Sequence, residues 1–242
     1  MINQYTKYKL ESIVLYFLLL YSISTLTQIR VGVASALFFW AIGDIYKRNL
    51  FRYFFKISLA ITFHSMAVVF IVFYFLSLRR INKKIYFLVL PVGILIWQFV
   101  AVFKEFVKNN IVDFLPGFVG AKVYSYLSIE EQAISTFNLW FIFVVFVYYL
   151  VLFKLEKFQD QFNLYVRVIA LGILMYFSFN FISILSIRIM NSVGLLVLIL
   201  IPSLVRVYKP SPLFWSVFFI MAFLLFLNWN VRNQLLRFDV LF

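Results

Sequence analysis

The stretch Ser12–Gly43 reads SIVLYFLLLYSISTLTQIRVGVASALFFWAIG and carries a single charged residue, Arg30. A transmembrane helix needs about 20 consecutive apolar residues, or about 17 at the short end. As one helix these 32 residues would extend about 48 Å, far beyond a hydrocarbon core of about 30 Å. We therefore expect two short membrane helices joined by a turn near Thr27–Arg30.

The composition of the whole chain agrees with this interpretation. Of its 242 residues, 65% are hydrophobic and only 13% are charged, too few to cover the surface of a soluble protein. Cysteine is absent, which rules out disulfides and thiolate metal sites. The polar start of the chain does not resemble a signal peptide, so we expect the first apolar run to be a retained span.

Apolar runs recur along the sequence and predict an all-α fold, a polytopic transmembrane helical bundle in one domain over residues 1–242. The spans should be helices, because an open sheet leaves backbone groups without hydrogen bonds in lipid. The tract Asn163–Val207 should fold back near Ser186–Asn191, whereas Tyr53–Leu78 is predicted to be one span. About eight apolar segments result, one or two of them candidates for re-entrant segments: 10–27, 30–46, 53–78, 85–103, 137–153, 164–186, 190–207 and 213–228.

Residues 104–136 form the one long connector. They mix aromatic residues with charges of both signs and contain Pro116, Gly117 and Gly120 as helix breakers. A loop of this length in a compact protein is more often functional than not. An interfacial or extracytoplasmic loop that faces substrate and a plain solvated connector are both compatible with this sequence.

The net charge of +13 points to the membrane surface rather than to nucleic acid. The lysines and arginines fall between apolar runs, where they anchor helices at anionic headgroups, and no basic stripe with interleaved aromatics is present. If every segment crosses, the short connectors carry seven basic residues on one side and eight on the other, which does not orient the chain. The same count places Arg30 and Arg188 on opposite faces of the membrane.

Two arginines interrupt long apolar tracts: Arg30 is the only charge in residues 12–43, and Arg188 is the only charge in residues 168–205. A guanidinium at membrane depth costs from about 2.5 to well over 10 kcal/mol, so such residues normally face a water-filled cavity or an anionic partner. Arginine also presents a rigid fork of donors suited to phosphate. The alternative is a side chain that snorkels to the interface from a helix end.

Polar residues near these arginines complete the candidate site. His64, the only histidine, lies inside an apolar run and suits a general base or acid, or a structural hydrogen bond to a neighbouring helix. Asn180 and Asn191 flank Arg188 and indicate a wet cavity or a polar helix–helix seam. The sequence has no carboxylate pair, glycine-rich phosphate loop or metal-binding cluster, so we expect chemistry without metal or cofactor.

These residues lie in motifs that resemble a known family. The stretch Gln28–Phe38, with Arg30 opening an alanine-rich helix, then Lys47-Arg48 and then Leu59–Ser65, with its Phe-His-Ser sequence, resembles the EpsG/Wzy-type polysaccharide polymerases. The later Leu185–Arg188, followed by an apolar run with Pro202, resembles the C-terminal half of that family. Members are usually longer, so we expect this chain to lack their N-terminal part.

The resemblance implies a multi-pass protein of the bacterial inner (cytoplasmic) membrane that acts in capsule, exopolysaccharide or O-antigen synthesis. It implies a glycosyltransferase that moves a glycan from undecaprenyl diphosphate to a lipid-linked repeat unit, with membrane lipid and other glycan-assembly proteins as further partners. His64 and Arg30 would then be catalytic, and Arg188, Asn180 and Asn191 would bind the substrate. A flippase or transporter for lipid-linked sugars, a membrane acyltransferase and a non-catalytic assembly subunit are the alternatives.

Overall fold

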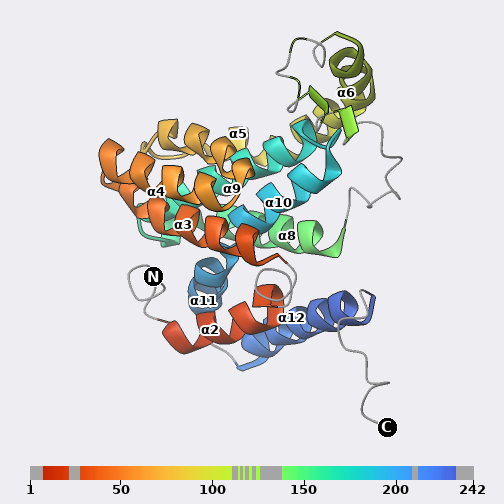
Figure 1. Cartoon of the computed structure of the whole chain (residues 1–242). Coiled ribbons are helices and arrows are strands. Elements are labelled where there is room, and N and C mark those ends of the chain that lie inside the picture. The colour runs from red at the N-terminus through yellow and green to blue at the C-terminus, as the bar shows by residue number, and fades with distance from the viewer. Residues whose placement is uncertain are drawn as a thin grey trace.

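The computed structural model describes residues 8–21, 28–110, 138–208 and 212–232, together with 114, 117, 120, 121, 124 and 125. Every regular element in these ranges is helical, which confirms the expected all-α bundle (Figure 1). The elements are α2 (Lys9–Tyr16), α3 (Ile29–Tyr46), α4 (Leu50–Phe63), the 3-10 helix η2 (Ser65–Phe75), α5 (Lys83–Phe87), α6 (Val89–Asn110), α8 (Leu139–Phe153), the 3-10 turn η4 (Leu155–Lys157), α9 (Gln161–Ser178), α10 (Ser183–Gly194), α11 (Val197–Tyr208) and α12 (Pro212–Arg232).

Two of these helices, α3 and α9, are long and apolar enough to cross a membrane by themselves. Two bent helices add crossings if each is one span: α6, bent by 49° between Val100 and Val102, and the pair α10–α11, bent by 47°. The helices η2, α8 and α12 contain shorter apolar stretches. The chain is therefore a multi-pass helical membrane protein.

The second expected hairpin is misplaced in the sequence-based prediction. We predicted a turn near Ser186–Asn191, but α10 runs through these residues and the chain turns earlier, at Phe179–Ile182. Ser192, one residue beyond the predicted turn, faces a neighbouring helix, because its hydroxyl shares a 2.6 Å hydrogen bond with that of Ser35 of α3.

A proline inside α11 is compensated from another helix. Pro202 has no N–H group, so the carbonyl of Leu198 loses its usual helical donor. The hydroxyl of Ser12 on α2 donates to that carbonyl at 2.7 Å, and Ser12 is fully buried. This bond fixes α2 against α11.

The predicted span Tyr53–Leu78 is not a single helix but a hairpin. α4 ends at His64 and η2 returns, so that Arg48, which precedes α4, donates to the carbonyl of Leu76 at 2.8 Å. Between the two legs, the Tyr53 hydroxyl donates to the Phe70 carbonyl at 2.5 Å. The segment therefore enters and leaves at the same end of the bundle, with His64 at the apex.

Hydrogen bonds gather the basic connectors at one end of the bundle, which we call the basic end. Arg167, near the start of α9, donates to the Arg79 carbonyl at 2.7 Å. Lys83 pairs with Glu156 at 2.6 Å, and this bond and its charge lower the pKa of the Glu156 carboxyl. The basic end carries Lys9, Lys47, Arg48, Arg52, Arg79, Arg80, Lys83, Lys84, Lys154, Lys157, Arg167 and Arg206.

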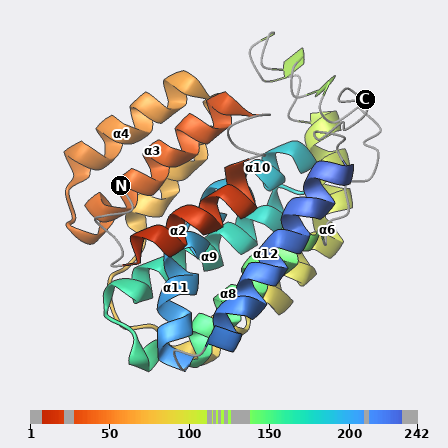
Figure 2. The same ribbon diagram turned by 90° about the horizontal axis from the view of Figure 1, so that it is seen from below.

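The ends of α2, α8 and α11 also lie there. Arg206 donates to the Tyr8 hydroxyl at 2.5 Å, and the Tyr208 hydroxyl donates to the Leu150 carbonyl at 3.0 Å. The count of seven against eight basic residues assumed that every segment crosses, whereas the hairpin returns to its starting end and the connectors before and after it both lie at the basic end. Figure 2 shows α3 and α4 side by side, with α10 on the other side of α3.

The opposite end, which we call the site end, contains the start of α3, the hairpin apex and the end of α9. The helix α6 continues to Asn110, so the first residues of the expected connector 104–136 are helical. Most of its remaining residues, like part of the expected turn near Thr27–Arg30, fall outside the described ranges. The role of that connector stays a prediction.

Candidate active site

His64 is positioned by the break between the two hairpin legs. Its backbone is extended, with φ −154° and ψ 121°, which ends α4. Its N–H still donates to the Ala60 carbonyl at 3.0 Å, while its ring Nδ1 accepts from the N–H of Met66 at 3.2 Å. The side chain thus caps the first turn of η2, which fixes the ring at the apex.

The apex meets α10, because Arg188 Nη1 lies 3.3 Å from His64 Nε2. N–H donors from Met66 and Arg188 therefore face both ring nitrogens. A neutral imidazole has one acceptor nitrogen and a protonated imidazole has none. The neutral ring can therefore accept from only one of these two donors at a time, and its acceptor nitrogen is the one able to take up a proton.

Arg188 keeps donor capacity beyond this contact. Its Nε is buried and has no hydrogen-bond partner within the described ranges, although the residue as a whole is only half-buried. A buried donor left unpaired costs about 1–3 kcal/mol, and more when charged. An anionic ligand that accepts from the guanidinium would remove that cost.

Arg30 lies at the same end as this pair, which corrects the expectation that Arg30 and Arg188 occupy opposite faces. It is exposed in the first turn of α3, and in the part of the chain that the structure describes its side chain makes no hydrogen bond or ion pair. α10 packs against the following turns of α3, where Ser35 bonds Ser192. The structure does not bring Arg30 into direct contact with either His64 or Arg188.

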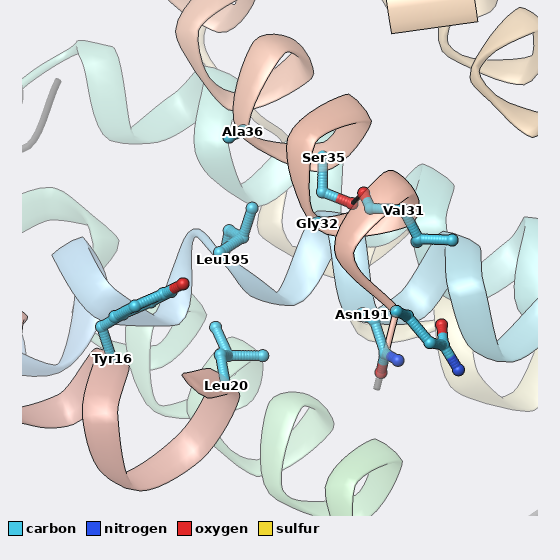
Figure 3. A pocket seen from close by; sticks show the side chains of 9 residues that line it. Tyr16, Leu20, Val31, Gly32, Ser35, Ala36, Asn191 and Leu195 are labelled. Carbon is cyan, nitrogen blue, oxygen red and sulfur yellow. Dashed lines mark hydrogen bonds between the residues drawn. The ribbon is translucent and has the colours of Figure 1, made fainter. Parts of the chain in front are cut away.

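A small pocket opens between α2, α3 and α10 (Figure 3). It encloses about 60 Å³, room for a few water molecules or one small substituent. Gln28, just before α3, has a buried Oε1 that finds no hydrogen-bond partner among the described residues, and Asn191 lies on the α10 wall. The lining residues are Tyr16, Leu20, Gln28, Val31, Gly32, Ser35, Ala36, Asn191 and Leu195.

The structure therefore separates the five candidates into groups. His64 and Arg188 form a pair, Asn191 lines the pocket one turn further along α10, and Arg30 begins the helix on the other side of the pocket. Asn180 lies in the turn between α9 and α10, where its N–H donates to the Phe177 carbonyl.

Sequence reasoning missed two polar residues that the structure singles out. Gln28 was seen only as part of a motif, although it lines the pocket. Arg48 was taken as a membrane anchor, but it bonds the end of η2. The sequence shows Arg48 only as part of a basic pair between two apolar runs. That position does not distinguish a membrane anchor from a residue that bonds another helix.

These features define a multi-pass helical membrane protein with a cationic and imidazole site at the end of the bundle away from its basic connectors. The sequence matches the model of the EpsG family over residues 1–238. The chain belongs to the EpsG family and is a polysaccharide polymerase-like membrane protein, as its motifs predicted. Comparisons with curated proteins and with solved structures found no significant match.

Proposed function

We propose that the protein is an inner-membrane enzyme that extends a capsule, exopolysaccharide or O-antigen chain. It transfers the growing glycan from undecaprenyl diphosphate to a lipid-linked repeat unit. Family membership supports the polymerase-like class. The contact between His64 and Arg188 is the observation that carries the assignment of the site, because it joins a base to an anion-binding group.

The charge distribution supports a site open to the outside of the cell. Short connectors rich in lysine and arginine stay in the cytoplasm. The basic end is therefore cytoplasmic in our proposal, and the site end faces the opposite compartment. Lipid-linked repeat units that have been flipped across the membrane would reach it there.

In the proposed reaction, His64 accepts the proton of the acceptor hydroxyl as its oxygen bonds to the anomeric carbon of the donor glycan. The bond between that carbon and the diphosphate oxygen breaks, and the diphosphate leaves with the electron pair. Arg188 stabilises the negative charge that develops on the leaving group, and Arg30 binds the same diphosphate. Asn191 and Asn180 would contact substrate, and metal independence remains a prediction.

The decisive experiment is elongation of a purified lipid-linked repeat unit by the purified protein. The wild type should form longer glycans, and H64A and R188A should each lose on the order of 10²-fold or more of the rate. R188K tests the fork, because lysine retains the charge but not the bidentate geometry.

Three results would contradict the proposal. Transbilayer movement of the lipid-linked unit without elongation would identify a flippase. Normal elongation by H64A and R188A would show that these two residues take no part in the reaction. Elongation only in the presence of a second protein would indicate that this chain is a non-catalytic subunit.

A further inference from the structure

We propose that Arg48 is a positioning residue that holds His64 against Arg188 from the far end of the hairpin. The inference rests on the proposed function in one respect, since it takes His64 as part of the reacting site. The geometry of the hairpin carries the rest.

Arg48 closes the base of the hairpin through reciprocal bonds. Its Nη1 donates to the carbonyl of Tyr74 at 3.2 Å and its Nη2 donates to the carbonyl of Leu76 at 2.8 Å. The Tyr74 hydroxyl donates back to the Arg48 carbonyl at 3.2 Å. The last carbonyls of a helix have no donors within it, so the guanidinium supplies donors that η2 needs.

The backbone of Arg48 supports a specific role for its side chain. Arg48 has φ 54° and is the only non-glycine residue with positive φ in the part of the chain that the structure describes. Position C′ after a helix commonly adopts this left-handed conformation, and glycine is preferred there because it carries no Cβ. The conformation favours glycine, but an arginine at this position also supplies the fork that bonds the end of η2.

The helix type of the returning leg explains what the clamp controls. A 3-10 helix rises about 2.0 Å per residue and seldom exceeds 3–4 residues, whereas an α-helix rises about 1.5 Å. η2 has 11 residues, so it spans about 22 Å, close to the 21 Å or so of the 14-residue α4. If η2 relaxed to an α-helix it would shorten by about 5 Å.

Such a shortening would mismatch the two legs and draw the apex away from α10. At the apex, Arg188 Nη1 lies 3.3 Å from His64 Nε2, and this contact would not survive a shift of that size. Arg48 bonds η2 at its end, and Tyr53 bonds it midway at Phe70. Together they hold the 3-10 leg at the length that places His64.

The test uses the absence of cysteine from the chain. Cysteines replace His64 and Arg188 together, and a short bifunctional thiol reagent cross-links them in native membranes. Adding R48G, which keeps the backbone conformation but removes the fork, should lower the cross-linking yield several-fold. R48K should lower it less, and R52A should leave it unchanged, because the exposed Arg52 side chain makes no hydrogen bond or ion pair within the described ranges.

In the protein with His64 and Arg188 intact, R48G should lower kcat for elongation by about 10- to 100-fold with a smaller change in KM. Unchanged cross-linking with R48G overturns the inference. If R48G fails to accumulate in the membrane, R48K and Y53F decide by the same yield, and no decrease in either overturns it. Because cross-linking needs no activity, failure of the polymerase proposal leaves this result interpretable.

Discussion

Ser35 of α3 and Ser192 of α10 share a hydrogen bond of 2.6 Å between their hydroxyl oxygens, and both residues are buried. Each hydroxyl also has a helical carbonyl within reach, Val31 for Ser35 and Arg188 for Ser192. Small residues of this kind let two membrane helices approach closely. The bond ties the helix that Arg30 opens to the helix that carries Arg188, so both arginines lie at the site end.

A substitution at Arg30 should lower activity without lowering the stability of the protein. R30A should reduce elongation on the order of 10-fold or more, because a diphosphate ligand would lose a charged donor pair. The apparent Tm of the purified protein should stay within about 1 °C, since surface substitutions usually change stability by no more than 0.5 kcal/mol. R30K is the matched control and should retain part of the activity. Equal activity of R30A and wild type would exclude Arg30 from the site.

The hairpin makes a direct prediction about membrane sidedness. Single cysteines at Lys47 and Arg80 flank the α4–η2 segment, and both should react with an impermeant thiol reagent only after the cells are opened. A cysteine at Asn110, the exposed end of α6, should react in intact cells. If the cysteines at 47 and 80 label from opposite sides, α4 and η2 cross the membrane as one span.

A buried ion pair stabilises the turn between α3 and α4. Lys56 Nζ lies 2.5 Å from Asp44 Oδ2 and 4.0 Å from the centre of the Trp40 ring, and the two charged side chains are only 12% and 8% exposed. D44A should destabilise the protein by about 3–5 kcal/mol, because it leaves the ammonium buried without its carboxylate.

The double variant D44L/K56M removes both charges and should recover most of that loss. Thermal unfolding in detergent of the wild type, the single variant and the double variant measures the effect. A double variant no more stable than D44A would show that the charges themselves, and not their pairing, are required.

The hydrogen bond from Ser12 to the Leu198 carbonyl should matter for stability only while Pro202 leaves that carbonyl without a helical donor. S12A should destabilise the protein by about 1–3 kcal/mol, since it leaves the buried Leu198 carbonyl without a donor. S12A/P202A restores a helical N–H at residue 202 and should recover stability relative to S12A. Thermal unfolding of both variants checks this order, and a further loss in the double variant would contradict it.

The sequence predicts best where one apolar run makes one helix. Residues 30–46 and 137–153 were expected as spans, and α3 and α8 occupy Ile29–Tyr46 and Leu139–Phe153. A side-chain cap explains the sharp start of α8, where the Asn138 side chain accepts from the N–H of Phe141 at 2.8 Å. The local sequence is enough to predict these two helices.

The sequence does not predict the break at His64 because nothing local requires it. Residues 57–78 contain no proline or glycine, and the uninterrupted apolar run is compatible with a straight helix. The return of η2 depends on donors from Arg48 and Tyr53, which are distant along the chain. For the same reason the sequence-based prediction grouped His64 with Arg30, whereas the structure brings His64 into contact with Arg188.

The hairpin also decides the direction of everything that follows it. Since α4 and η2 return to the end from which they started, α6 runs opposite to α3 although a long apolar segment separates them. Hydropathy alone counts that segment as a crossing and assigns α8 to α11 to inverted orientations. The direction in which each of the later helices crosses the membrane therefore depends on the bend at His64.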